Sequence, residues 1–168
     1  EGAHDDGSGV VILMNIIRAF KQAGIQPYNT IRVMPYQDEE VGLQGIHTYA
    51  EKKEGSGENH LYHIEIDSGV GMPTGVGLYG DSTQIANLNT FVGTYMDLGY
   101  ERPVVVRAGE VYNRFPTATD LGAVAGWFMP DNSKDYFLYH HASNDNFEVV
   151  SQDELKACSK AMTKLVYL

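Results

Sequence analysis

The sequence contains a single cysteine, Cys158, among 168 residues. One cysteine forms no internal disulfide and no thiolate cage for zinc, so a metal site in this chain must use Asp, Glu and His side chains. No segment approaches the roughly 20 apolar residues of a membrane span, and no signal peptide is visible. Basic residues form no cluster, which argues against a nucleic-acid partner.

Acidic residues outnumber basic ones, 22 to 12, and give a formal net charge of −10. Carboxylates gathered at one place in such a chain would attract divalent cations. The hydrophobic fraction of 43% in 168 residues is enough for one domain with a sizeable core and too little for two. We therefore expect residues 1–168 to fold as one domain.

Hydrophobic periodicity predicts helices alternating with strands. Helices are expected over residues 8–24, 41–53, 82–99 and 151–168, with Ser8 and Ser151 as N-caps and Gly24 as a stop. Strands are expected over residues 30–36, 61–66, 103–106 and 127–128, and an aromatic loop over residues 136–141. This alternation is typical of an α/β fold built around a mainly parallel or mixed sheet.

Carboxylates stand where the predicted elements meet. Asp5, the Glu39-Glu40 pair and Asp67 each occupy a strand-to-helix or strand-to-loop junction. Sites of open α/β sheets gather outside the carboxyl ends of strands, so these junctions can converge. Converging carboxylates would repel one another without a cation. Oxygen and imidazole ligands suit zinc, manganese or cobalt, and the pattern therefore favours a metal centre.

Four segments in order resemble the motifs of the M28 family of zinc peptidases. They are His-Asp-Asp-Gly-Ser-Gly at 4–9, Asp-Glu-Glu-Val-Gly-Leu-Gln-Gly at 38–45, Ile-Glu-Ile-Asp at 64–67 and His-His-Ala-Ser-Asn-Asp at 140–145. Residues 67–75, 119–121 and 136–141 are most similar to the carboxypeptidase Q (plasma glutamate carboxypeptidase) branch. The resemblance implies a three-layer, aminopeptidase-like α/β fold with a central mixed sheet flanked by helices. It also implies an exopeptidase, either an aminopeptidase or a dipeptidase, acting on peptides or dipeptides.

The resemblance also assigns roles to residues. Asp5 would bridge two zinc ions, Glu40 and His141 would complete one metal site, and Asp67 would serve the other. Glu39 would hold the metal-bridging water and take its proton as general base. These roles agree with the chemistry of paired metal ions, which lower the pKa of bound water and leave a nearby carboxylate to accept the proton.

One expected ligand is missing from the sequence. The family supplies a further histidine, in a His-x-Asp motif upstream of Asp5, and the sequence begins after that position. His4 is a poor substitute because it is adjacent to Asp5. The resemblance thus implies the C-terminal major part of one catalytic domain, either a fragment or a chain paired with a complementing N-terminal segment or a second copy. Alone, it is expected to bind metal weakly or at a single site, with little activity.

Three more residues and a location are expected for the zinc peptidase, and two other functions remain as alternatives. The resemblance gives Asp120 a role near the active site or the substrate amine. Tyr112, in the loop before Asp120, is a candidate for lining a substrate pocket. Asp145 would orient the loop that carries His141, because ligand histidines have outer partners. A secreted, lysosomal or periplasmic location is expected. The alternatives are a non-catalytic binding or scaffold domain and a single-zinc acyltransferase of the glutaminyl-cyclase kind.

Each motif taken alone also has a simpler interpretation. Asp-Asp-Gly-Ser-Gly is typical of a turn followed by a helix start, and Glu39-Glu40 is typical of a solvated helix start. One of His140 and His141 would then be a packing residue. The order of the four motifs, and not any one of them, favours the metal centre.

Overall fold

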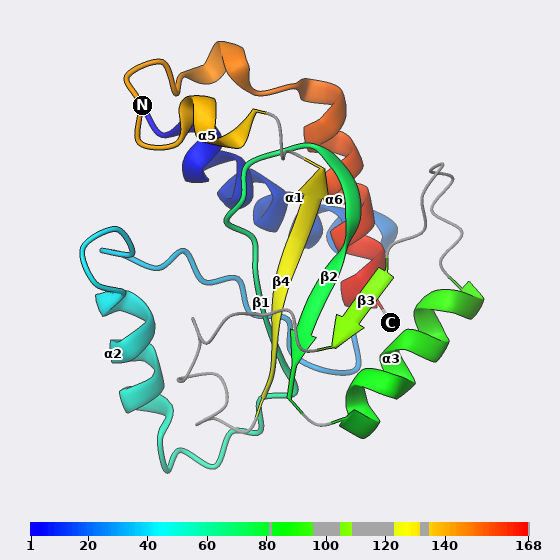
Figure 1. Ribbon diagram of the computed structural model, residues 1–168. Coiled ribbons are helices and arrows are strands. Elements are labelled where there is room, and N and C mark those ends of the chain that lie inside the picture. Colours follow the sequence, from blue (N-terminus) through cyan, green and yellow to red (C-terminus); the bar gives the residue numbers. More distant parts are fainter. Residues whose placement is uncertain (81, 96–104, 109–122, 132–134, 168) are drawn as a thin grey trace.

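The computed structural model describes residues 1–80, 82–95, 105–108, 123–131 and 135–167, and it has a mixed α/β fold, as predicted (Figure 1). The helices are α1 (Ser8–Ala23), α2 (Gln44–Lys53), α3 (Ser82–Tyr95), α5 (Tyr136–Tyr139) and α6 (Gln152–Tyr167). Two short helical turns, η1 (Ala3–Gly7) and η2 (Phe147–Val149), precede α1 and α6. The strands are β1 (Tyr62–Glu65), β2 (Met72–Tyr79), β3 (Val105–Ala108) and β4 (Val124–Asp131).

The four strands form one mixed sheet in the order β1-β4-β2-β3. Strand β1 is parallel to β4, with Glu65 opposite Trp127, while β2 is antiparallel to β4 and parallel to β3. Because β1 and β4 run in the same direction, their carboxyl ends lie at the same edge of the sheet. The segments that follow these two strands contain Asp67 and His140-His141, so the topology directs both toward one side of the molecule.

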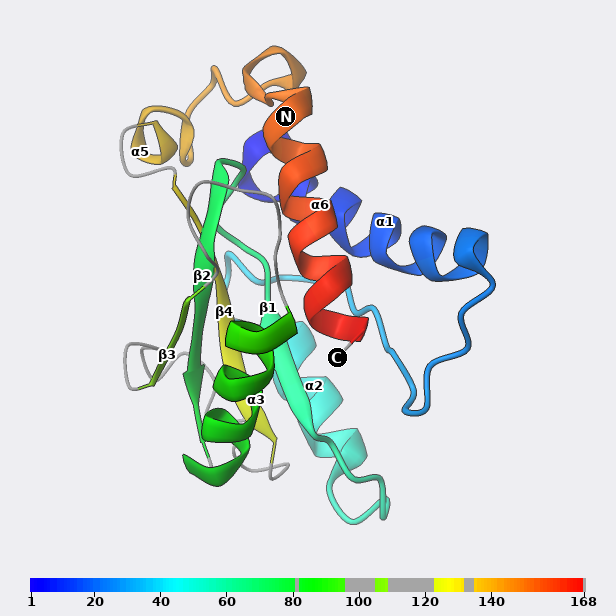
Figure 2. The same ribbon diagram turned by 90° about the vertical axis from the view of Figure 1, so that its right-hand side faces the viewer.

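Strand β4 contacts a different hydrophobic cluster through each of its two faces. Val124 and Phe128 belong to the main core, which α1 and α6 complete with Ile12 and Met162 among others. Ala125 and Trp127 point to the opposite face and pack in a second cluster with Ile46 of α2. Helices therefore pack on both faces of the sheet, which confirms the three-layer arrangement. Figure 2 shows α1 and α6 together on one side of the sheet.

The predicted end of the first helix is confirmed, whereas its predicted cap is wrong. Gly24 ends α1 with a left-handed φ of 65°, and its N–H reaches the Lys21 carbonyl. Ser8 is the first residue of the helix, and its hydroxyl donates to the His4 carbonyl at 2.8 Å. The Asp6 side chain accepts from the Gly9 N–H at 3.1 Å instead, as an Asp before a helix commonly does.

The strand predicted over residues 30–36 is also wrong. This segment belongs to no strand and has no ladder partner in the part of the chain that the structure describes. Its sequence suits a strand, but a strand needs a neighbour for its backbone groups. Side chains anchor it instead: Arg32 donates to Tyr49 of α2 and to Glu58, the latter at 2.9 Å.

The other predicted elements are found, with shifted ends. The helix expected from Val41 begins at Gln44, because Gly42 and Leu43 have left-handed backbones. The strands expected at 61–66 and 127–128 are β1 and part of β4, and residues 105–106 of the one expected at 103–106 lie in β3. The aromatic loop expected at 136–141 contains the short helix α5. The Ser151 cap of α6 is confirmed, since Ser151 Oγ accepts from the Glu154 N–H at 3.4 Å.

No helix within the described ranges is both long enough and apolar enough to cross a bilayer. Cys158 lies at 0% exposure in the core, where its thiol donates to the Gly71 carbonyl at 3.0 Å. Burial raises the pKa of this thiol to about 11. The cysteine is thus a buried residue that packs as a small hydrophobe.

Candidate metal centre

Asp5 lies in η1, directly before α1, and a distant carboxylate fixes its backbone. Asp145 accepts hydrogen bonds from the N–H groups of His4 at 2.6 Å and of Asp5 at 3.0 Å. The Tyr136 hydroxyl donates to Asp5 Oδ1 at 3.3 Å. The Asp5 side chain is only 6% exposed. Its orientation is therefore set before any ligand binds.

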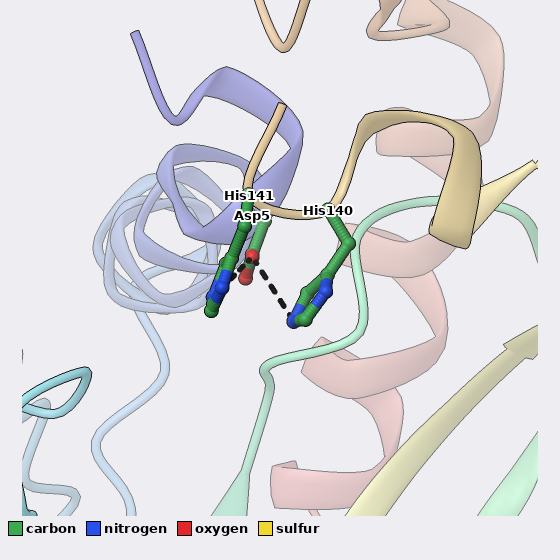
Figure 3. A group of neighbouring side chains, drawn as sticks. All are labelled: Asp5, His140 and His141. Atoms are coloured by element: carbon green, nitrogen blue, oxygen red, sulfur yellow. Dashed lines mark ion pairs between the residues drawn. The ribbon is translucent and has the colours of Figure 1, made fainter. Parts of the chain in front are cut away.

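The second oxygen of Asp5 faces two imidazoles, as Figure 3 shows. Asp5 Oδ2 lies 3.7 Å from His140 Nε2 and 3.8 Å from His141 Nε2. The same nitrogen of His141 lies 2.8 Å from Glu40 Oε2. The structure thus brings together Asp5, Glu40 and His141, the three ligands expected for one metal site, and adds His140.

A second group contains carboxylates only. Oxygen atoms of Glu39, Glu65 and Asp67 lie within 4.8 Å of one another, and all three residues are half-buried. Asp67 follows β1 and Glu39 belongs to the turn before α2, as expected. Glu65 was not expected. Its position two residues before Asp67 is the signal for it, because alternate residues of a strand point to the same face.

Asp5 of the first group and Asp67 of the second act electrostatically on the same two side chains, Asp6 and Tyr136. Burial raises the pKa of Asp6 to about 9, and the charges of Asp67 and Asp5 add to the increase. Burial, followed by the charges of Asp5 and Asp67, raises the pKa of the Tyr136 hydroxyl. The site therefore concentrates negative charge in a partly buried space.

This set of donors fits a divalent cation. Carboxylate oxygens and imidazole nitrogens are ordinary zinc ligands, and bonds of about 2.0–2.2 Å put neighbouring donors about 3.3–3.6 Å apart in a tetrahedral site. The separations of 2.8, 3.7 and 3.8 Å around Asp5 and His141 bracket that range. A cation would also relieve the repulsion among the carboxylates.

Comparison with known proteins identifies the family. The model of peptidase family M28 matches residues 1–166. The chain belongs to peptidase family M28.

Named relatives of this M28 chain include both carboxypeptidases and aminopeptidases. It is 24% identical over 168 residues to carboxypeptidase Q of Homo sapiens, covering 100% of this chain and 35% of the relative. It is 28% identical over 181 residues to leucine aminopeptidase 1 of Fusarium vanettenii, covering 99% of this chain and 45% of the relative. The chain thus spans less than half the length of the relatives it matches.

Two solved structures share the fold. A peptidase M28 precursor from Shewanella amazonensis superposes with a TM-score of 0.85 at 28% identity, covering 99% of this chain and 37% of that one. BSAP, a zinc aminopeptidase from Bacillus subtilis, superposes with a TM-score of 0.71 at 19% identity, covering 99% and 42%. The aminopeptidase-like fold expected from the resemblance is therefore confirmed.

The remaining predicted residues of the M28 chain fall in different places. Asp120 and Tyr112 lie outside the described residues. Asp145 belongs to the segment that carries His141, but its side chain bonds to the backbone at His4 and Asp5. Asp145 therefore holds the segment of Asp5 against the segment that carries His141. His4 is in neither donor group: its ring is 3% exposed, packs over Gly69, and has its pKa lowered by burial.

Backbone strain is concentrated at the donors of the M28 chain. In the described ranges, the non-glycine residues with positive φ are Asp38 (59°), Leu43 (60°) and His141 (55°). The first two flank the Glu39-Glu40 turn, and the third is itself a donor. A left-handed backbone costs about 1–3 kcal/mol at such residues and persists where the surroundings impose it. One of the three strained residues is therefore a predicted ligand, and the other two border the turn that carries Glu39 and Glu40.

Proposed function

We propose that this M28 chain carries most of the metal centre of a two-zinc exopeptidase that removes an N-terminal residue from a peptide or splits a dipeptide. The observation that carries the proposal is the convergence of Asp5, Glu40 and His141 from three distant segments. The relatives named as carboxypeptidase and aminopeptidase support the reaction class.

In this proposal the side chains divide into ligands and a base. Asp5, Glu40 and His141 hold one zinc ion, and Asp5 and Asp67 contribute to the second. Zinc, when bound, supplies a Lewis acid that polarises the scissile carbonyl and lowers the pKa of water. The carboxylate of Asp5 suits a shared position, because its near-complete burial and its bonds to Tyr136 and, through the backbone, Asp145 hold it in one orientation.

Glu39 is the proposed general base. Its carboxylate lies within 4.8 Å of that of Asp67, in a turn whose geometry is set by backbone bonds from Leu43 and Gly42 to the Glu39 carbonyl. Glu39 would take a proton from the attacking water as the new C–O bond forms. It would return that proton to the amine nitrogen as the C–N bond breaks, so that it ends the cycle ionised.

The experiment measures zinc content together with hydrolysis of aminoacyl anilides and dipeptides, on a protein that also contains the upstream histidine segment that the family supplies. Glu39→Gln should lower turnover by about 10²–10⁴-fold and keep the zinc, because it removes a proton acceptor and no ligand. Glu40→Gln should lose zinc as well. Glu51→Gln, on the exposed side of α2, is the matched control and should change neither quantity. Protein that binds no zinc would disprove the proposal.

One alternative has a distinct outcome in the same experiment. The mixed donor group around Asp5 suits zinc on its own, whereas the group of Glu39, Glu65 and Asp67 contains no imidazole. One zinc per chain, with cyclisation of N-terminal glutamine and no peptide hydrolysis, would favour the acyltransferase. The secreted, lysosomal or periplasmic location and any pairing with a second chain stay predictions.

A further inference from the structure

His140 stands beside the expected ligands in a defined orientation. Its ring stacks on that of His141, with centroids 3.8 Å apart and planes at 17°. The rings of Tyr136 and Phe137 lie at 5.1 and 5.7 Å from it. These contacts direct His140 Nε2 toward Asp5 Oδ2, at 3.7 Å (Figure 3). A histidine that served only in packing would not need its Nε2 close to the carboxylate of Asp5.

We propose that His140 is a fourth protein ligand of the cation held by Asp5, Glu40 and His141. The proposal deepens the proposed function and rests on it for the identity of the cation. A single ion would then be bound by two carboxylates and two adjacent imidazoles, all from this chain.

The distances favour this set of four. The nitrogens of His140 and His141 are nearly equidistant from Asp5 Oδ2, at 3.7 and 3.8 Å. These separations lie just above the spacing of about 3.3–3.6 Å between neighbouring ligands of tetrahedral zinc. Asp5 Oδ1 is already bonded to Tyr136, so Oδ2 is the oxygen that both imidazoles share.

The left-handed backbone of His141 explains how adjacent residues can both reach the ion. Side chains of consecutive residues in a strand point to opposite faces. His141 departs from that geometry with a φ of 55°, and its ring turns back onto that of His140. The strain at His141 therefore makes a paired use of the two imidazoles possible.

Four side chains would close a tetrahedral zinc site, whereas a catalytic site keeps one position for water. Glu40 and Asp5 are charged, and His141 lies between them. His140 is neutral when it acts as a ligand, and its contacts with the other donors are the approach of its Nε2 to Asp5 Oδ2 at 3.7 Å and the ring stack on His141. It is thus the donor that water or substrate would displace, and the resting chain would hold its ion more tightly than three ligands allow.

The test uses the full chain with zinc alone as the probe. Zinc affinity is measured by competition with a chromophoric chelator, for the parent chain and for His140→Ala, His141→Ala and His47→Ala. His47 is exposed on α2 and serves as the matched histidine control. His140→Ala should weaken zinc binding by about tenfold or more, since even outer partners of ligands are worth 10–100-fold, and His47→Ala should leave it unchanged.

X-ray absorption at the zinc edge gives a second readout, the number of imidazoles on the metal. With one equivalent of zinc, two imidazoles in the parent chain and one in His140→Ala support the proposal. One imidazole in the parent chain, or unchanged affinity in His140→Ala beside a loss in His141→Ala, overturns it and leaves the proposed peptidase standing. The zinc-binding effect of His140→Ala is measured independently of peptide hydrolysis, so it supports the His140 ligand whether or not the peptidase proposal holds. If His140→Ala does not fold, His140→Gln is measured with the same outcomes.

Discussion

Asp145 illustrates how a residue that is no ligand can set the position of one. It is 3% exposed, and its two oxygens accept from backbone N–H groups 141 and 140 positions away. An Asn in its place keeps one acceptor and sets an NH₂ group against a backbone N–H. We expect Asp145→Asn to cost about 1–3 kcal/mol of unfolding free energy, the cost of leaving a buried donor unpaired. Urea denaturation measures this loss.

The same variant should weaken zinc binding by about 10–100-fold, as loss of a partner outside the ligand shell does. Asp153→Asn, at a side chain 97% exposed on α6, is the control and should change neither property measurably. Equal zinc affinity in the two variants would show that Asp145 supports the fold without positioning Asp5.

At the scale of residues, the sequence was informative about donor type and weak about geometry. Motif order selects Asp5, Glu40 and His141, and the structure brings these side chains together. Motif order does not show how His140 and His141 are oriented relative to each other, because that orientation depends on a left-handed φ that no local pattern specifies. Nor does it select Glu65, whose carboxylate enters the group through its register on β1.

Among the elements, the loop after β1 depends on a glycine. Gly69 has a φ of +65°, and an added Cβ would lie 1.7 Å from Cε1 of the buried His4 ring. Gly24, at the end of α1, has the same φ of +65° and open space around it. Ala at either position must adopt a left-handed backbone, at about 1–2 kcal/mol.

Gly69→Ala should therefore be less stable than Gly24→Ala by about a further 1–3 kcal/mol, the usual cost of overpacking a core. Denaturation midpoints of the two variants measure the difference directly. Equal midpoints would mean that the His4 ring can move aside, and that the contact with Gly69 does not hold η1 against the sheet.

The segment 30–36 depends on charge instead of a strand ladder. Glu58 pairs with Arg32 at 2.9 Å and with Lys53 of α2 at 2.5 Å. Hydrogen bonds from Lys53 and Arg32 lower the pKa of Glu58 to about 2. A lowered pKa in the folded state stabilises the fold above the unfolded pKa, near 4.5, and this contribution is lost as the pH falls toward 2.

Glu58→Gln should therefore lower the melting temperature at pH 7 and have a much smaller effect near pH 2.5. Thermal melts of both proteins at the two pH values test this. Because the pair is at the surface, 0.5 M salt should also reduce the difference at pH 7. A difference that is independent of pH would assign the effect to packing.

Elements were predictable where local periodicity and tertiary contacts agree. Helix α6 has both its Ser151 cap and its apolar face. Segment 30–36 has the composition of a strand, yet pairing is a property of neighbours and not of the segment. Strand β2 was missed for the opposite reason: Pro73, Gly75 and Gly77 have low strand propensity, and the sheet imposes the conformation.

For the whole molecule, the excess of negative charge makes stability depend on the cation. Carboxylates crowded in the folded state repel, and a bound divalent ion reverses that effect. A ligand that binds only the folded state stabilises it by about 2.7 kcal/mol at a concentration of 100 Kd. Zinc should thus raise the melting temperature and EDTA should reverse the shift, as scanning calorimetry can record.

Magnesium at the same concentration is the control, since it prefers an octahedral shell of oxygens and should shift the melting temperature far less. Identical shifts with both ions would indicate general screening of the net charge of −10 and not a site.

The only tryptophan of the 168 residues is Trp127. Its indole N–H donates to Ser68 Oγ at 2.7 Å, beside Asp67, and its ring packs against the same hydrophobic cluster as Leu43, which follows the Glu39-Glu40 turn. Its emission therefore arises from one location, within a few residues of both donor groups. The protein carries an intrinsic fluorophore whose intensity and wavelength can report occupation of the metal centre in real time, with no label and no substituted residue.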